Sequence, residues 1–254
     1  MGNIAQRHKM ILDRIKKDGF VKVQELSRDF DVSEVTIRKD LKYLESRKLL
    51  HRTHGSASTL SSITVDKHID EKEKVNIEEK IRIAKAASAL LRPNDKIIIA
   101  SGTTLLAFAN ELDIDFPLTV ITSSVKVSLT LCYDPNIDIV QLGGTMRKNS
   151  VSVIGHFAED MLNSLSFNKL FLGVDGLDFS NGLTTSDLSE AYINKKMINA
   201  SQEIIVLTDS SKFGETGFCK ICELDKVHHI ITDTNAPSHM ISMIEETGIK
   251  VTLV

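Results

Sequence analysis

VKVQELSRDFDVSEVTIRKDLKYLESRKLLHRTH, residues 21–54, decides the fold of the amino-terminal part of this chain. A short apolar segment leads into a short helix, and Asp31-Val32 form a turn after it. Ser33 suits the start of the next helix, because its hydroxyl can accept a hydrogen bond from an unpaired backbone N–H of the first helical turn. Two helices joined in this way and followed by a basic ribbon, Leu49 to His54, predict a winged helix-turn-helix.

The helix that follows Ser33 has an apolar side and a polar side. Its apolar residues at helical spacing are expected to hold it against the other helices; they are Val35, Ile37, Leu41 and Leu44. The other side combines small polar residues with cations, which is how a helix reaches base edges and phosphates of duplex DNA. The predicted DNA-binding residues are Ser33, Glu34, Thr36, Arg38, Lys39 and Lys42 on the helix, with Arg52 and His54 on the ribbon.

Charge separates this part of the chain from the rest. Residues 1–60 contain 13 Lys and Arg against 8 Asp and Glu, so the totals of 31 and 34 leave 18 and 26 for residues 61–254. A basic small domain beside an acidic large one is expected when only the first meets a polyanion. The charges of Arg38, Lys39 and Lys42 alone would suit a merely solvated helix face, but the turn, the cap and the ribbon favour DNA.

Four sequence blocks in order carry a family resemblance: RHKMIL (7–12), VKVQEL (21–26), VSEVTIRKDL (32–41) and LHRTHGSA (50–57). They resemble the DNA-binding signature of DeoR-type bacterial transcription regulators. The family usually has Arg-Arg where this chain has Arg38-Lys39, and Gly-Gly where it has Gly55-Ser56. Lys39 keeps the charge but lacks the planar fork of arginine, so the resemblance does not imply a bidentate base contact there.

Length and composition agree with two domains. The chain has 254 residues, of which 42% are hydrophobic, and that is ample for a buried core. We expect a DNA-binding domain at 1–57, a linker at 58–75 and an α/β domain at 76–254. No apolar run approaches the ~20 residues of a membrane helix, and the polar start does not resemble a signal peptide, so a cytoplasmic protein is expected. Three cysteines are too few for a disulfide framework.

Beyond residue 75, helical periodicity alternates with short apolar runs. Asn76 and Glu79 resemble a capping box at the start of a helix whose buried stripe begins at Ile77. Seven strands are expected at 96–100, 118–121, 137–141, 169–173, 203–208, 229–232 and 250–253, with helices at 105–111, 125–132, 156–165, 187–200 and 238–247. Apolar strands that alternate with helices imply an α/β fold with a mostly parallel sheet covered on both faces.

Polar or glycine clusters follow five of these strands. In an open parallel sheet the carboxyl ends of the strands gather along one edge, so the clusters converge on a single crevice and predict a small-molecule site. The candidate effector-binding residues are Ser101, Gly102, Thr103, Thr104, Thr122, Ser123, Gly143, Gly144, Asp175, Gly176, Glu190, Lys195, Asp209 and Lys212.

The chemistry of these residues favours a phosphorylated polyol. Ser101-Gly102-Thr103-Thr104 lies between a strand and a helix, where backbone N–H groups and the helix dipole accommodate phosphate. Alone it suits a plain capped turn better, but Gly143-Gly144 and Lys212 at the same edge shift the balance toward phosphate. The carboxylates are suited to accept hydrogen bonds from sugar hydroxyls, although any one of them could simply face water. Glu190 and Lys195 point to neighbouring rather than identical helix faces, so at least one of the two could be surface only.

The resemblance extends over this part of the chain as well, through the same strand ends, Gly182-Leu183-Thr184 and Asp209 to Gly214. They look like the effector domain of DeoR-type regulators, which is similar in fold to ribose-5-phosphate isomerase. The resemblance implies a phosphorylated sugar as effector and a change in operator affinity as output, most often relief of repression. Family members commonly have Asn where this chain has Ser123, so ligand specificity is not implied.

Three functions from different classes compete. The first is a sugar-phosphate-responsive transcriptional regulator of carbohydrate metabolism, with no cofactor and no catalytic residue. The second is a sugar-phosphate isomerase-like enzyme that uses Asp175, Glu190 and Lys212. That function does not account for the predicted DNA-binding domain. The third is a metal or redox switch at Cys219-Lys220-Ile221-Cys222 with His228 and His229, for which a lone CxxC is weak evidence. Reading two DNA half-sites further predicts a homodimer or homotetramer.

Overall fold

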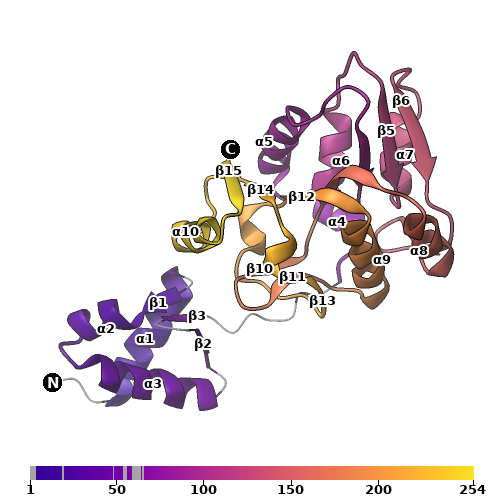
Figure 1. Cartoon of the computed structure of the whole chain (residues 1–254). Helices are drawn as coiled ribbons and strands as arrows, with labels where there is room; N and C mark the ends of the chain where they lie inside the picture. The colour runs from indigo at the N-terminus through magenta and orange to yellow at the C-terminus, as the bar shows by residue number, and fades with distance from the viewer. Residues whose placement is uncertain (1–3, 19, 48, 54–55, 59–63, 65) are drawn as a thin grey trace. The chain divides into compact units, whose positions relative to one another are not determined.

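The computed structural model describes residues 4–18, 20–47, 49–53, 56–58, 64 and 66–254. The chain divides into two compact units, Met1–Ser62 and Ile63–Val254 (Figure 1). Each is described separately. No helix among the described residues is long and apolar enough to cross a membrane.

The amino-terminal unit is a winged helix-turn-helix, as the sequence predicts. Its elements are α1 (Ile4–Asp18), β1 (Phe20–Lys22), α2 (Val23–Asp29), α3 (Glu34–Ser46), β2 (His51–Thr53) and β3 (Ser56–Ser58). The three strands form an antiparallel sheet in the order β1-β3-β2. Ser33 caps α3, and its Oγ accepts a hydrogen bond from the Thr36 backbone N–H at 3.2 Å.

Apolar side chains from every helix of this unit meet in one small core. Ile11 and Ile15 of α1, Leu26 of α2 and Ile37 of α3 are each at most 2% exposed. Val35 is different: the sequence places it on the buried side of α3, but it is 58% exposed. It lies in the first turn of α3, so the buried stripe begins only with Ile37.

The carboxyl-terminal unit contains a parallel sheet and two smaller antiparallel sheets. Its helices are α4 (Ile69–Glu73), α5 (Ile77–Ser88), α6 (Thr103–Asn110), α7 (Val125–Leu131), α8 (His156–Asn163), α9 (Leu188–Asn199), α10 (Ser238–Glu246), and the short 3-10 turns η1 (Ser210–Lys212) and η2 (Leu224–Lys226). Its strands are β4 (Lys96–Ile99), β5 (Leu118–Thr122), β6 (Ile137–Gln141), β7 (Thr145–Arg147), β8 (Ser152–Ile154), β9 (Phe167–Leu172), β10 (Gly176–Asp178), β11 (Gly182–Thr185), β12 (Ser201–Leu207), β13 (Cys219–Cys222), β14 (His229–Thr232) and β15 (Lys250–Leu253).

The large sheet has the order β15-β14-β12-β9-β4-β5-β6, and all of its pairings are parallel. The chain runs outward from β4 through β5 to β6, returns to β9 on the other side of β4, and continues through β12 and β14 to β15. The direction in which successive strands are added to the sheet therefore reverses between β4 and β9, although the strands themselves run parallel. In open parallel sheets such a reversal creates a crevice at the carboxyl ends of the two strands.

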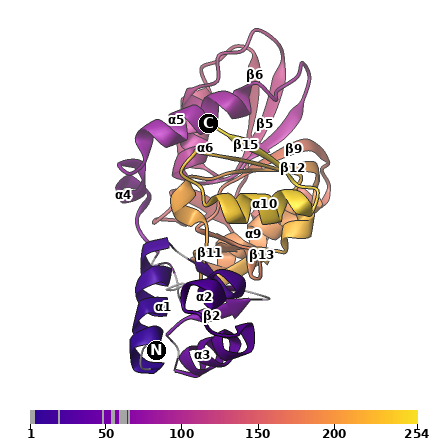
Figure 2. The ribbon, with the colours of Figure 1, turned by 90° about the vertical axis from the view of Figure 1, so that its left-hand side faces the viewer.

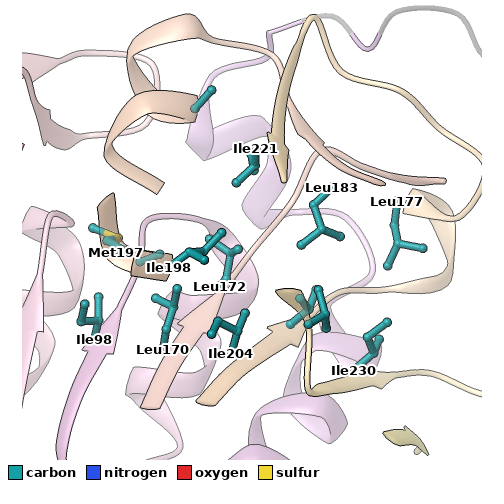
Figure 3. Close-up of a cluster of buried hydrophobic side chains, with 14 of the residues drawn as sticks. Ile98, Leu170, Leu172, Leu177, Leu183, Met197, Ile198, Ile204, Ile221 and Ile230 are labelled. Atoms are coloured by element: carbon teal, nitrogen blue, oxygen red, sulfur yellow. The ribbon is translucent and has the colours of Figure 1, made fainter. Parts of the chain in front are cut away.

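Alternate residues of the strands feed two separate cores, one on each face of the sheet. Ile97 and Ile99 pack with α5, α6 and α7, whereas Ile98 packs with α8, α9 and α10. Figure 3 shows Ile98 and Leu170 of the strands beside Met197 of α9. In Figure 2, α10 is the yellow helix, which contacts β15. Both faces of the sheet are thus covered, as the apolar strands predict.

Two small sheets and one helix were not expected from the sequence. The sheet β10-β11-β13 closes one core, and β7 pairs with β8 in an antiparallel hairpin after β6. The short helix α4 lies within 58–75, the stretch expected as a linker, and its Ile69 is only 3% exposed. Residues 66–75 therefore belong structurally to the carboxyl-terminal unit rather than to a free linker.

The start of α5 differs from the expected capping box. Asn76 has a φ of +52° and makes no side-chain capping bond; its Nδ2 donates instead to Oδ1 of Asp209 at 2.9 Å. Ile77, expected in the buried stripe, is 52% exposed, while Ile83 is fully buried. The amide of Asn76 is thus used for a tertiary contact at the end of β12.

Candidate functional site

The exposed face of α3 carries the predicted DNA-contacting cations. Arg38, Lys39 and Lys42 are all exposed, and Glu34 and Thr36 are half-buried beside them. Nη2 of Arg38 donates to Oε2 of Glu34 at 2.5 Å. An exposed pair of this kind contributes little stability, so the guanidinium is easily transferred to another acceptor.

A buried carboxylate ties α3 to α1. Asp40 accepts from Nε of Arg7 at 2.6 Å, from Nη2 of Arg7 at 3.1 Å, and its Oδ1 lies 2.9 Å from Nε2 of His8. Burial pushes the pKa of Asp40 up, but the hydrogen bonds from Arg7 and His8 outweigh it, so the pKa lies below its ordinary value. This ionic contact fixes the orientation of the helix that presents Arg38.

The two predicted ribbon contacts cannot be placed. Arg52 lies on β2, but its side chain and the whole of His54 fall outside the described residues.

The loops after β4, β9 and β12, where the sequence predicts a crevice, follow three neighbouring strands at the reversal point of the sheet. Gly102 has a φ of +134° and precedes α6, whose first residues are Thr103 and Thr104. A Cβ on Gly173, just after β9, would lie 2.6 Å from Leu105 Cδ2 and 3.6 Å from the Ser101 carbonyl oxygen. The loops after β4 and β9 are therefore in contact. Ser101, Gly102 and Thr103 are half-buried there, whereas Thr104 is 8% exposed.

Asp175 lies at the end of β9 with both carboxylate oxygens bonded. Oδ1 accepts from Nζ of Lys72 at 2.8 Å. Oδ2 accepts from the backbone N–H of Ser186 at 2.9 Å, from its hydroxyl at 2.8 Å, and from the Thr185 hydroxyl at 3.3 Å. Burial pushes the pKa of Asp175 upward, but Lys72 and Ser186 more than offset it, so the pKa is lowered. Gly176, the next residue, is buried in β10.

Glu190 lies on the first turn of α9 and shares Thr185 with Asp175. Its Oε2 accepts from the Thr185 hydroxyl at 3.3 Å, and its Oε1 accepts from Nη1 of Arg147, also at 3.3 Å. Burial raises the pKa of Glu190, and a hydrogen bond with Ser150 and the charge of Arg147 offset only part of that rise. We define the charged network as Asp66, Lys72, Arg147, Asp175, Asp187 and Glu190.

Arg147 is the hub of the network, because each of its guanidinium nitrogens has an acceptor. Nη2 donates to Asp66 at 2.5 Å, Nε lies 3.3 Å from Asp187, and Nη1 also donates to Ser150 at 3.0 Å. The hairpin β7–β8, which supplies Arg147, begins after the exposed pair Gly143-Gly144.

A second group of polar side chains lies at the end of β12. Oδ1 of Asp209 accepts from Asn76 and from the Ser211 backbone N–H at 3.0 Å. Lys80 is 6% exposed, and its Nζ donates to the carbonyl oxygens of Lys72 and Val75, both at 2.6 Å. Burial lowers the pKa of Lys80, the charge of Asp209 opposes this change, and the charge of Lys212 adds to it. Lys72 and Lys212 thus both lie within electrostatic reach of Lys80.

Three predicted residues lie apart from these contacts or are committed locally. The Thr122 hydroxyl is fully buried and accepts from the Ser124 backbone N–H at 3.0 Å, and Ser123 is 2% exposed. Lys195 is exposed on α9, with Nζ 5.5 Å from the centroid of the Tyr192 ring. The structure therefore brings together the residues after β4, β9 and β12, with Glu190, but not these three and not Gly143-Gly144, which follow β6 two strands away from β4.

Sequence reasoning missed the cations of the charged network. Lys72 stands in a charged run that the sequence assigns to the linker, and Arg147 lies in the hairpin β7–β8, which the sequence does not predict. Lys80 did have a signal, because it stands four and seven residues before the buried Ala84 and Ala87 and so interrupts an apolar stripe.

The cysteines do not form a metal cluster with the neighbouring histidines. Cys219 and Cys222 lie on β13, whereas Nδ1 of His228 accepts from the Ile204 backbone N–H at 3.1 Å. Burial raises the pKa of Cys222 to about 12, which keeps its thiol protonated. Among the described residues, no group of three or more His, Cys, Asp or Glu side chains is placed to hold a metal ion.

Comparison with protein families gives two matches that together cover most of the chain. Residues 7–63 match the DeoR-like helix-turn-helix domain, and residues 75–234 match the DeoR C terminal sensor domain. These two ranges correspond to the unit that carries α3 and the unit that carries the crevice.

Individual relatives are similar over nearly their full length. The uncharacterised HTH-type transcriptional regulator YulB of Bacillus subtilis is 36% identical over 99% of this chain and 97% of its own. The lactose phosphotransferase system repressor of Lactococcus lactis is 36% identical over 94% of each chain. Among solved structures, ribose 5-phosphate isomerase A of Methanocaldococcus jannaschii aligns with 54% of this chain and 55% of its own, at 19% identity and a TM-score of 0.41. A likeness this weak carries no weight for the function of the chain.

Proposed function

Because this chain belongs to the DeoR family of transcriptional regulators, we propose that it is a repressor of carbohydrate metabolism whose affinity for its operator is set by a phosphorylated sugar. The observation that carries the proposal is the pairing, in one chain, of a winged helix with exposed cations and a sheet edge at which hydroxyls, lysines and carboxylates gather. We also propose that it acts in the cytoplasm and as a homodimer or homotetramer.

The DNA-binding half of the proposal rests on α3. Its exposed Arg38, Lys39 and Lys42 stand on a helix held in place by the Ser33 cap and by Asp40. Cations on the exposed face of a recognition helix supply phosphate contacts, and an arginine among them can read guanine. Arg52 and His54 of the ribbon are proposed as additional contacts to the backbone or the minor groove.

The proposal of a phosphorylated sugar as effector rests on two kinds of group at the sheet edge, one suited to phosphate and one suited to sugar hydroxyls. We place the phosphate of the ligand at Ser101, Gly102, Thr103 and Thr104, at the start of α6, because the first backbone N–H groups of a helix favour an anion. We propose Lys212, in the turn after β12, as a cation for the same ligand. We place the sugar hydroxyls against Asp175, Asp209 and Glu190, which are acceptors. The lactose system repressor of Lactococcus lactis, a relative, is consistent with a sugar-derived effector.

Catalysis on the same ligand is the competing function. An isomerase needs a carboxylate free to take a proton from carbon. Asp175 is poorly suited, because four hydrogen bonds occupy its oxygens and its pKa is lowered. We therefore propose binding without turnover, and incubation of each ligand with the protein followed by product analysis tests it.

The test of the whole proposal uses the full-length protein. Duplexes are selected from a random pool at a fixed salt concentration, and phosphorylated sugars are screened by thermal shift, because a ligand of the native state raises the melting temperature. We expect at least one duplex to be enriched and at least one sugar phosphate to change its affinity about fivefold or more. Failure to enrich any duplex would refute the proposal.

A further inference from the structure

We propose that β6, the last strand on one side of the large sheet, pairs with β6 of a second copy of this chain, so that the two sheets join about a twofold axis. This interface rests on the proposed function, because it assigns a surface to the proposed homodimer. Three features of the sheet edge point to it: open backbone groups on β6, exposed apolar side chains beside them, and charges that suit an antiparallel partner.

The strand β6 has a neighbour on one side only, namely β5. Just after β6, the backbone N–H of Leu142 donates to the carbonyl oxygen of Thr122 on β5 at 2.9 Å. Because alternate residues of a strand turn their backbone groups to opposite sides, Ile139 and Gln141 direct theirs away from β5. Among the described residues no strand pairs with this outer side of β6. An open edge of this kind is a template for another strand.

Exposed apolar side chains lie beside this edge on one face of the sheet. Val140 of β6 is in register with Ile121 of β5, whose side chain belongs to the core under α8 and α9. Val140 therefore lies on the face that α8 covers, and it is 37% exposed. On α8 itself, Phe157 is 75% and Met161 37% exposed. These three side chains leave an apolar surface open to solvent.

The direction of Phe157 and Met161 follows from the position of α8. Nζ of Lys196 on α9 donates to Oδ1 of Asn163 at 3.0 Å, so one flank of α8 faces α9. At about 3.6 residues per turn, Phe157 and Met161 lie on the opposite flank. Figure 1 shows α8 on the same side of α9 as β6. The two side chains thus extend the apolar surface of Val140 at the open edge of the sheet.

A twofold axis perpendicular to the sheet gives both copies the same contacts and makes their β6 strands antiparallel. With Val140 of one copy opposite Val140 of the other, Ile139 of each copy faces Gln141 of the other. The outward N–H and C=O groups of these two residues are then paired. Both α8 helices lie on one face of the joined sheet, so Phe157 and Met161 of the two copies meet over Val140. The edge is therefore complementary to itself.

The charges near β6 also suit an antiparallel partner. Asp134 and Asp138 lie before and within the first half of β6, and the exposed Lys148 follows its carboxyl end, in the hairpin β7–β8. The antiparallel arrangement places the acidic half of one strand beside the half that Lys148 follows. Asp138 is then opposite Leu142 of the second copy. Like charges directly opposite each other, which destabilise a pair of strands, are avoided.

The experiment compares the full-length protein with Val140→Lys and with the matched control Leu253→Lys. Leu253 is 48% exposed on β15, the terminal strand on the other side of the same sheet. Sedimentation equilibrium measures the mass, and hydrogen exchange measures protection of the backbone amides of Ile139 and Gln141. Val140→Lys places two ammonium groups opposite each other at the axis, whereas Leu253→Lys leaves the β6 edge unchanged.

We expect Val140→Lys to halve the mass of the oligomer, from dimer to monomer or from tetramer to dimer. The amides of Ile139 and Gln141 should exchange about tenfold faster or more, because their pairing strand is lost. Leu253→Lys should match the wild type in both measurements. Phe157→Glu, on a different element, should act in the same direction as Val140→Lys and serves if that variant fails to fold.

A disulfide tests the register of the two strands. Opposite residues of a non-hydrogen-bonded antiparallel pair have Cα atoms about 4.5 Å apart, which a disulfide can span. Val140→Cys, combined with Cys132→Ser to remove an exposed thiol, should therefore give a covalent dimer on mild oxidation. Leu253→Cys in the same background should stay uncrosslinked.

An unchanged mass in both Val140→Lys and Phe157→Glu would overturn the proposed interface. Loss of the oligomer in Leu253→Lys alone, or a covalent dimer from Leu253→Cys but not from Val140→Cys, would overturn it as well. In each of these cases a wild type that enriches a duplex and responds to a sugar phosphate leaves the proposed regulator standing. A wild type that enriches no duplex refutes the regulator, while its mass and that of Val140→Lys still decide the interface.

Discussion

Arg38, which we propose as a DNA contact, already has a hydrogen-bond partner in the free protein. In the free protein its guanidinium is held by Glu34 four residues earlier, at 2.5 Å, and the side chains of Arg38 and Glu34 are 56% and 38% exposed. The pair pre-orients Arg38 along the face of α3, and because exposed pairs contribute at most about 1 kcal/mol, little is lost when the guanidinium moves to a base.

Replacement of Arg38 by Ala should therefore weaken operator binding by about 1–3 kcal/mol if Arg38 reads a base, and leave effector affinity unchanged. Fluorescence anisotropy with the selected duplex measures this. Arg82→Ala, which removes an exposed arginine of α5, is the control for loss of charge. If Arg38→Ala binds as tightly as Arg82→Ala, Arg38 belongs only to the solvated face of α3.

Glu190 is a residue whose ionised form lowers the stability of the folded protein. Burial raises its pKa in the folded protein, so the folded state binds a proton more readily than the unfolded state. The stability associated with this group is present below the unfolded pKa of about 4.3 and is lost as the pH rises through the folded pKa. At neutral pH ionisation of the Glu190 carboxylate therefore lowers the free energy of unfolding.

Glu190→Gln should consequently raise the melting temperature at pH 7, and the gain should vanish when both proteins are compared near pH 4. Differential scanning calorimetry across this range measures the effect. The same variant should lose its response to the sugar phosphate, because an acceptor for ligand hydroxyls becomes partly a donor. A lower melting temperature at pH 7 would mean that the Arg147 contact outweighs the cost of burial.

At the scale of elements, the contact between α1 and α3 stabilises the recognition helix. Asp40 is 6% exposed and receives three hydrogen bonds from two α1 side chains. Asp40→Ala should destabilise the amino-terminal unit by about 1–3 kcal/mol, since it leaves the partly buried Arg7 without its acceptor. The carboxyl-terminal unit should unfold as before.

Thermal unfolding followed by hydrogen exchange separates the two units in this experiment. Asp29→Ala is the control, because it breaks the exposed pair of Asp29 with Arg14 and should cost less than about 1 kcal/mol. If Asp40→Ala and Asp29→Ala destabilise the amino-terminal unit equally, the buried contact of Asp40 with Arg7 stabilises it no more than an exposed ion pair does.

The sequence predicts best those elements that depend only on residues close together in the chain. The apolar runs at 229–232 and 250–253 coincide with β14 and β15, and Ser33 caps α3 through its own hydroxyl. The charged network is different, because Lys72 and Asp175 are far apart in the sequence and meet only through the fold. A charged run such as 70–74 looks like a solvated linker until its tertiary partners are known.

The order of the strands determines which of the predicted strand-end residues are neighbours. A parallel sheet gathers strand ends at one edge whatever the order, so Ser101, Asp175 and Asp209 were expected together. Only the order shows that β12, β9 and β4 are neighbours while β6 lies two strands further on, beyond β5. Gly143-Gly144 thus lies away from the reversal point, and the hairpin that follows reaches it through Arg147.

At the scale of the whole molecule, one winged helix contacts only a few base pairs, and that limits what a single chain can recognise. Two copies related by a twofold axis read two half-sites about one helical turn apart, and linkage of the two contacts raises affinity without any new interaction. The acidic carboxyl-terminal unit, with its 26 Asp and Glu against 18 Lys and Arg beyond residue 60, adds no attraction of its own to DNA. The proposed pairing of chains would supply the affinity and specificity that one winged helix lacks.

We accordingly expect sedimentation equilibrium to show at least a dimer at micromolar concentration, and the selected duplexes to contain two inverted half-sites. Shortening the duplex to one half-site should reduce affinity by about a hundredfold or more, because the second contact is then lost rather than linked. The affinity for the shortened duplex should also depend less steeply on salt concentration, because fewer DNA phosphates are neutralised. A monomer that binds a single half-site as tightly as the full duplex would contradict this expectation, and the specificity of the protein would then have to come from α3 and the ribbon of one chain alone.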